Sequence, residues 1–117
     1  MTPKQWPDET KARAEKAMAD LEAFYDDFCN LTPFGRRPAM PKLEQLHPRL
    51  MDACDADGYV LQKLTSLAGH CRQLAAQRPP FDFDDADACR QGLSCVSSIR
   101  AQLHMHGLIE HYSRPSA

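Results

Sequence analysis

Apolar residues recur every three or four positions along most of this chain, and prolines divide the pattern into three stretches. This spacing places apolar side chains on one face of an α-helix, whereas half-buried strands alternate at every second residue. No segment alternates with period two over a useful length. The pattern therefore predicts an all-α fold, and a length of 117 residues predicts one domain over 1–117.

The first and last stretches each predict one helix. The first runs from about Pro7 to Asn30 and begins with Asp8 and Glu9, whose carboxylates favour the positive end of a helix dipole. The last stretch follows a run of aspartates and predicts a helix over 85–110.

The middle stretch is the longest and keeps its heptad spacing from Leu43 to Leu74. Pro48 disfavours a helical conformation in the residue before it, and Pro79 cannot continue a helix. A long helix is therefore predicted over 48–77, after a short helical turn and a proline-rich joint.

One turn-type string, Asp55-Ala-Asp57-Gly58, lies inside this middle stretch. A turn rarely preserves the heptad phase, and the phase passes through Asp57 without a slip. We therefore expect an elongated antiparallel three-helix bundle. A four-helix bundle with a break at 55–58 is the alternative.

The first predicted helix is shorter than the other two, so it leaves part of the seam between them uncovered. A second chain is the simplest cover for such an apolar seam. We therefore expect a protein partner, which can be a second copy of the chain in a homodimer.

Two strongly polar residues fall at core positions of the expected seam. Facing residues of an antiparallel hairpin have a constant index sum, and aligning Leu64 with Ile99 pairs Asp57 with His106. Glu110 lies one turn beyond His106 on the same face. The first interpretation is a buried structural pair that fixes register. Two alternatives are a solvent-facing pair, which a misplaced register or a helix break would produce, and a metal or acid–base site formed by Asp57, His106 and Glu110.

The proline-rich joint at 31–42 is the main candidate for partner binding. It holds Phe34, Arg36, Arg37 and Met40, and aromatic and arginine side chains dominate binding hot spots. A linker that packs Phe34 and Met40 on the end of the bundle is the alternative interpretation.

Charge gives little support to nucleic-acid binding, because the formal net charge is −2 and duplex-binding domains are usually basic. Arg36, Arg37, Lys42 and Arg49 nevertheless make the 36–49 region locally basic, so this function is a third hypothesis.

No complete catalytic or cofactor motif occurs in the sequence, and no apolar run approaches the roughly 20 residues that span a membrane. The five cysteines include no C-x-x-C pair and indicate reduced, buried thiols. The first residues show no secretory signal pattern, so we expect a cytoplasmic location. The sequence thus predicts a non-enzymatic interaction or regulatory module without a cofactor, such as an adaptor, an inhibitor, an immunity protein or a complex subunit. A metal-dependent bundle enzyme or sensor is the alternative.

Overall fold

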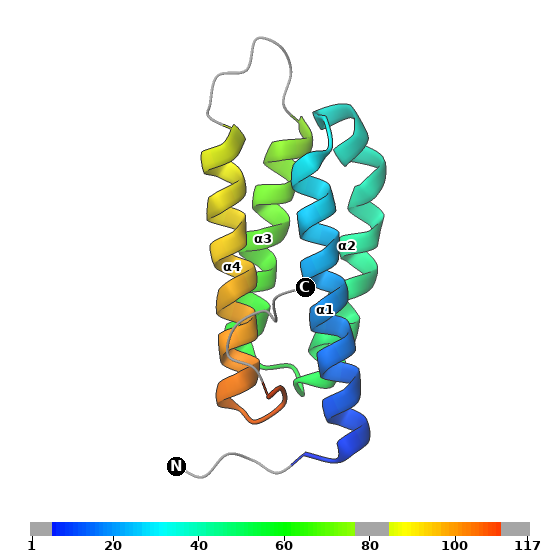
Figure 1. Ribbon diagram of the computed structural model, residues 1–117, viewed down its shortest axis with the longest axis vertical. Coiled ribbons are helices and arrows are strands. Elements are labelled where there is room, and N and C mark those ends of the chain that lie inside the picture. Colours follow the sequence, from blue (N-terminus) through cyan, green and yellow to red (C-terminus); the bar gives the residue numbers. More distant parts are fainter. Residues whose placement is uncertain (1–5, 77–84, 111–117) are drawn as a thin grey trace.

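The computed structural model describes residues 6–76 and 85–110, and within these ranges it contains four α-helices and no strand. The helices are α1 (Asp8–Asn30), α2 (Pro33–Ala53), α3 (Gly58–Ala76) and α4 (Asp85–Met105). They lie side by side, and each runs antiparallel to the next along the chain (Figure 1). The predicted all-α class is confirmed, and α1 has the predicted bounds to within one residue. The predicted joint between α3 and α4 lies outside the described residues.

The continuous helix predicted over 48–77 is wrong. The chain reverses at 54–57, and the alternative with a break at 55–58 is confirmed. The heptad phase survives the reversal because each helix of an antiparallel hairpin turns its own apolar face to the same core. Leu50 before the turn and Val60 after it are both fully buried. An unbroken heptad phase is therefore compatible both with one long helix and with two antiparallel helices.

The reversal between α2 and α3 combines a left-handed helix end with a helix cap. Asp55 and Ala56 have φ angles of 55° and 57°. The Ala56 N–H donates to the Met51 carbonyl at 2.8 Å, as in a Schellman-type end. The Asp57 carboxylate then accepts a hydrogen bond from the Val60 N–H at 3.0 Å and caps α3.

The start of α2 is a second correction. The helix begins at Pro33, so most of the segment expected as a joint at 31–42 forms its first turns. The Thr32 hydroxyl accepts a hydrogen bond from the Gly35 N–H at 3.2 Å and caps the helix. Proline is favoured at the first helical position because its missing N–H would have no helical partner there. The Thr-Pro pair is therefore a helix-start signal that the sequence carries.

Three further prolines, Pro38, Pro41 and Pro48, lie inside α2 without ending it. Each proline lacks the N–H that would bond the carbonyl four residues earlier. Their spacing of three and seven residues places them on one face of the helix, and all three are exposed. Water can reach the carbonyls that they leave, while Leu43 and Leu46 on the opposite side remain buried.

The four helices enclose one core, because α1–α2, α2–α3, α3–α4 and α1–α4 all pack against each other. Fully buried side chains come from every helix and include Met18, Phe28, Leu50, Leu67 and Ile99. The seam that a short first helix would have left open is thus covered. The reason for expecting a second chain at that seam no longer holds.

Polar side chains join α1 to α4 across the core. Glu22 and Arg100 form a buried ion pair, with the Arg100 Nε 2.8 Å from a Glu22 carboxylate oxygen. The Tyr25 hydroxyl donates to the Cys89 carbonyl at 2.6 Å. This hydroxyl occupies the space that a Cβ at Gly92 would need, so glycine is required there.

The last helix ends at Met105, earlier than the 85–110 expectation. Gly107 has a φ of 79°, and the Leu108 N–H donates back to the Leu103 carbonyl at 2.9 Å. This pattern is the Schellman motif, in which glycine takes the left-handed position. Leu108 is fully buried and holds the turn against the core.

Replacing Ala56 by glycine should stabilise the protein. Alanine in the left-handed region carries a steric cost that glycine avoids, so we expect Ala56→Gly to raise the free energy of unfolding by about 1 kcal/mol. Ala19, exposed within α1, provides the matched control, because Ala19→Gly should lower this free energy by about 1 kcal/mol. Urea denaturation of the three proteins measures both changes. Equal losses in the two variants would contradict the turn described at 54–57.

Candidate functional site

Asp57 and His106 meet, as the predicted register required. The His106 Nε2 lies 3.0 Å from a carboxylate oxygen of Asp57, and the Gln102 amide nitrogen lies 3.0 Å from the same ring nitrogen. However, the side chains are 41% exposed for His106 and 19% for Asp57. The pair therefore lies at the edge of the bundle where α3 begins, and the expected buried core layer is not formed.

The environment of Asp57 favours its ionised form. Burial alone would raise the pKa of Asp57, but hydrogen bonds from the Val60 N–H, His106 and Gln102 outweigh it and hold the pKa below its usual value. The positive end of the helix dipole at the start of α3 also favours a negatively charged capping side chain. Asp57, Gln102 and His106 therefore have a structural role: they cap α3 and attach it to α4.

The third member of the metal hypothesis does not complete the cluster. Glu110 lies beyond the turn that ends α4 and is exposed. Across 6–76 and 85–110, no group of three or more histidine, cysteine, aspartate or glutamate side chains is placed to hold a metal ion. The described geometry therefore gives Asp57, His106 and Glu110 no support as a metal centre.

Burial separates one of the four partner-binding candidates of the 31–42 segment from the others. At about 100° per residue, Phe34, Arg37 and Met40 follow one another along one side of α2, whereas Arg36 is buried. Phe34 is 65% exposed, with the Arg37 guanidinium 5.0 Å from its ring centre. Arg37 also donates to the α3 carbonyl of Ala75 at 2.8 Å. Met40 lines a small cavity in the α2–α3 seam.

Arg36 points into the molecule and is 1% exposed. Its guanidinium donates to the carbonyls of Phe28 and Cys29 at 3.0 Å each, and it reaches the Leu74 carbonyl at 3.5 Å. These carbonyls belong to the last turns of α1 and α3. Arg36 therefore stabilises helix ends and is not available at the surface, which corrects its placement in an exposed joint.

The basic residues of 36–49 are likewise dispersed. Arg36 is buried, and Arg37 is bonded to α3. Arg49 pairs with Asp20 of α1 at 2.8 Å, and Lys42 lines the α1–α2 face. The four cations do not form one surface patch, so the geometry does not favour a nucleic-acid interface.

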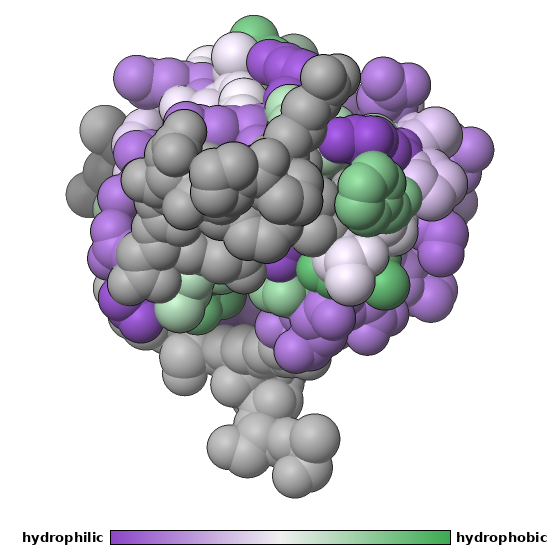
Figure 2. All heavy atoms as spheres, turned by 90° about the horizontal axis from the view of Figure 1, so that it is seen from above, coloured by the Kyte–Doolittle hydropathy of each residue, from purple (hydrophilic) through white to green (hydrophobic). Residues whose placement is uncertain are grey.

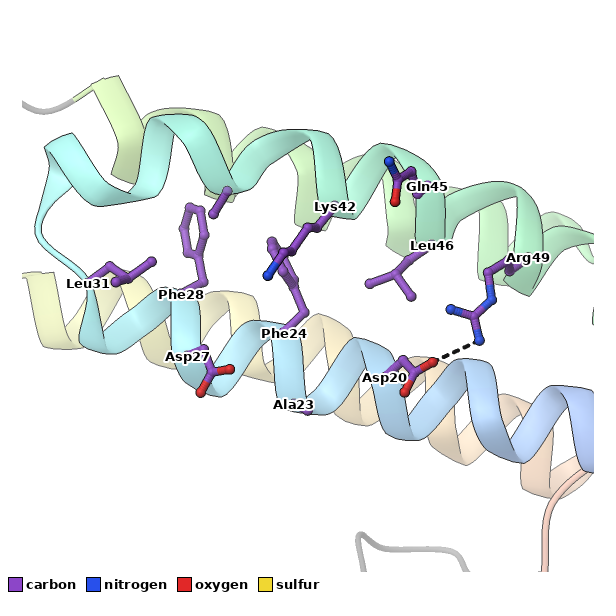
Figure 3. Close-up of a pocket in the computed structure, with 11 residues that line it drawn as sticks. Asp20, Ala23, Phe24, Asp27, Phe28, Leu31, Lys42, Gln45, Leu46 and Arg49 are labelled. Atoms are coloured by element: carbon purple, nitrogen blue, oxygen red, sulfur yellow. Dashed lines mark hydrogen bonds and ion pairs between the residues drawn. The ribbon is translucent and has the colours of Figure 1, made fainter.

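A groove of about 410 Å³ hollows the outer face between α1 and α2. Phe24 and Phe28 rise from α1 between the two helices, and Lys42, Leu46 and Arg49 extend from α2 towards α1 (Figure 3). The groove is also lined by Asp20, Ala23, Asp27, Leu31, Ala39 and Gln45. We call these residues the α1–α2 groove.

The α1–α2 groove was not anticipated from the sequence. The pattern placed Phe24 and Phe28 in the core, where they do lie, but it gave no adjacent helix at 33–53. Without α2, Ala23 and Asp27 were simply the outer side of the first helix. The groove exists because residues 39–49 of α2 pack alongside the second half of α1.

Viewed from the end at which α2 and α4 begin, the described residues around the rim of the bundle are mostly hydrophilic, and hydrophobic side chains occupy small separate areas (Figure 2). Among the described residues, no helix combines the length and apolar character that crossing a membrane requires.

Comparison of the chain with known protein families, with curated proteins and with solved structures finds no significant match.

Removing the cap of α3 should destabilise the protein. We expect Asp57→Ala to lower the free energy of unfolding by about 1–2 kcal/mol, the usual cost of losing a helix cap. Asparagine caps helices about as well as aspartate, so Asp57→Asn should retain most of the stability at pH 7. Urea denaturation of both variants checks this, and an Asp57→Ala variant as stable as the parent would contradict it.

The contacts of Asp57 also predict how the stability of the protein changes with pH. Because the pKa of Asp57 is lowered in the folded state, its carboxylate stabilises the fold above the ordinary aspartate pKa of about 4. This contribution is lost as the pH falls below that value and through the folded pKa. The stability difference between the parent and Asp57→Asn should therefore shrink below about pH 4.

Proposed function

We propose that this protein is a non-enzymatic interaction module that binds an amphipathic helix of another protein in the α1–α2 groove. The observation that carries the proposal is the combination of an apolar floor with charged rims of opposite sign. Asp27 stands on the α1 side and Lys42 on the α2 side, while the ion pair between Asp20 and Arg49 spans the groove at one end (Figure 3). Amphipathic helices bind other proteins by laying an apolar face into such a groove.

The dimensions of the groove suit a short helix. On α1 its lining extends from Asp20 to Leu31, which corresponds to about 16 Å at 1.5 Å per residue. This length accommodates about three helical turns, enough for apolar anchors at positions i, i+3 or i+4, and i+7. Ala23 has a small side chain and lets a partner approach the floor closely.

Two exposed apolar side chains lie at one end of the groove. Leu31, which lines it, is 40% exposed, and Phe34 is 65% exposed. Phe34, Pro38 and Gln45 fall on one stripe of α2, and Gln45 also lines the groove. Phe34 is thus the partner-binding candidate from the sequence that fits this surface, and it would act as an aromatic anchor.

The charged rims specify the partner further. Hydrogen bonds from Lys16 and Arg49 hold the pKa of Asp20 below its usual value, so this rim is ionised at neutral pH. Because Asp20 and Arg49 already pair with each other, a complementary helix would carry a basic residue towards Asp27 and an acidic residue towards Lys42. Such pairing sets orientation and on-rate more than affinity.

This proposal corresponds to the classes of adaptor, inhibitor, immunity protein or complex subunit. It requires no cofactor and no catalytic residue. We place its action in the cytoplasm, where the buried thiols of Cys54, Cys71 and Cys95 would stay reduced.

Site-specific photocrosslinking in the source cell tests the proposal. A photoreactive phenylalanine analogue at position 23 lies in the groove, and the same analogue at the exposed Ser97 of α4 serves as the matched control. Position 23 should give a discrete adduct with a different protein, mapped to a helical segment of that partner, whereas position 97 should not. Ala23→Arg should then abolish binding of that segment in calorimetry.

Three outcomes would contradict the proposal. An adduct with a second copy of the chain would assign the groove to a homodimer. Equal adducts from positions 23 and 97 would indicate contact without a specific surface. The absence of any adduct from position 23 would remove the groove as a binding site.

A further inference from the structure

A second pocket, on the other side of α1, brings two cysteines together. It has a volume of about 330 Å³ and lies between the end of α1 and the start of α4. Cys29 of α1 and Cys89 of α4 both line it, beside Tyr25 and Leu93. Both cysteines are half-buried, so small molecules can reach them from solvent.

The side chains of Arg36 and Tyr25 each contact both Cys29 and Cys89. One terminal nitrogen of Arg36 lies 3.0 Å from the Cys29 carbonyl and 3.9 Å from the Cys89 sulfur. The Tyr25 hydroxyl donates to the Cys89 carbonyl at 2.6 Å and also contacts the Cys29 thiol. Arg36 and Tyr25 therefore tie the end of α1 to the start of α4 beside the pocket that both cysteines line.

The three remaining cysteines are buried, although Cys71 lies within electrostatic range of Cys29, Cys89 and Arg36. Burial raises the pKa of Cys71 to about 12 and also raises the pKa values of Cys54 and Cys95. These thiols stay protonated and are inert, because the thiolate is the reactive form. Reactivity is thus expected at the pocket between α1 and α4.

The guanidinium next to Cys89 decides which chemistry the pocket favours. A positive charge beside a cysteine stabilises its thiolate, and the same charge opposes the binding of a metal cation. No metal-holding group of three ligands occurs among the described residues. The pocket is therefore suited to a thiolate that attacks an uncharged sulfur electrophile.

We propose that Cys29 and Cys89 form a thiol–disulfide exchange site whose substrate is a small aliphatic disulfide such as oxidised glutathione. The Cys89 thiolate attacks one sulfur of glutathione disulfide, forms a mixed disulfide and releases one glutathione thiolate. Cys29 then loses its proton to solvent and attacks the Cys89 sulfur, which releases the second glutathione thiolate. The two protein thiols are oxidised to one disulfide, and glutathione disulfide is reduced to two molecules of glutathione.

This disulfide would link the end of α1 to the start of α4 and close a loop that contains α2 and α3. Closing such a loop restricts the unfolded chain, so the oxidised protein should unfold at a higher temperature than the reduced one. The modification does not depend on the α1–α2 groove, which lies against the opposite side of α1.

Titration of the full chain with oxidised and reduced glutathione tests the proposal. Intact mass should show the loss of two hydrogens in the parent protein, and peptide mapping should identify the Cys29–Cys89 link. Cys29→Ser should stop the reaction at the mixed disulfide on Cys89, and Cys89→Ser should abolish both products. Cys95→Ser, at a buried thiol, is the matched control and should behave as the parent does.

The same titration in urea shows whether the folded pocket is responsible. In the unfolded chain the preference for the Cys29–Cys89 link should disappear. A parent protein that gives only mixed disulfides, or links Cys71 to either residue, would overturn the proposal. The proposal would also be overturned if the folded parent protein did not react with oxidised glutathione while its thiols reacted normally in urea. Circular dichroism of each serine variant verifies that it is folded.

Discussion

The buried guanidinium of Arg36, a residue of α2, contacts each of the other three helices. The last carbonyls of an α-helix have no helical partner and carry a partial negative charge. Arg36 donates to the carbonyls of Phe28 and Cys29 at the end of α1, and it reaches Leu74 near the end of α3. Neither helix has a basic residue in its own last turn. The cation that these helix ends need comes instead from the first turn of α2.

This junction also explains how the two proposed sites are placed. The end of α1 has two accessible sides, and each forms a wall of one site. The side towards α2 carries Phe24, Phe28 and Leu31 in the α1–α2 groove, while the side towards α4 carries Cys29 in the thiol pocket. Because Arg36 fixes α1 against α2 and contacts Cys89 of α4, it holds both walls in position.

The sequence predicted those features that depend on periodicity alone. It placed α1 correctly. It also paired Asp57 with His106, because facing residues of an antiparallel hairpin have a constant index sum. That sum is the same whether or not the first helix of the hairpin extends further back along the chain. It could not separate one long helix from two, since Leu50 and Val60 face the same core in both topologies. The string Asp-Ala-Asp-Gly was the better guide there, because Asp57 caps α3 and aspartate, as at Asp55, tolerates the left-handed conformation.

The other differences arise from tertiary contacts. Pro38 and Pro48 are tolerated in α2 because their face is exposed, which no local rule reveals. Arg36 was expected at a surface because a buried arginine needs acceptors, and its acceptors come from helix ends far apart in the sequence. Glu22 and Arg100 occur beside core positions of α1 and α4, and charged residues at such positions on two helices are the signal for their ion pair. The groove and the thiol pocket required the four-helix topology before either could be inferred.

The most direct measurement of the central claim is hydrogen exchange at the Arg36 side chain. In a proton–nitrogen correlation spectrum at mildly alkaline pH, an exposed arginine such as Arg72 should lose its Nε–H signal to rapid exchange with water. The Nε–H of Arg36, bonded to the Phe28 carbonyl, should remain visible and show contacts to the Phe28 ring. An Arg36 signal that exchanges as fast as that of Arg72 would contradict the buried junction on which the fold and both sites depend.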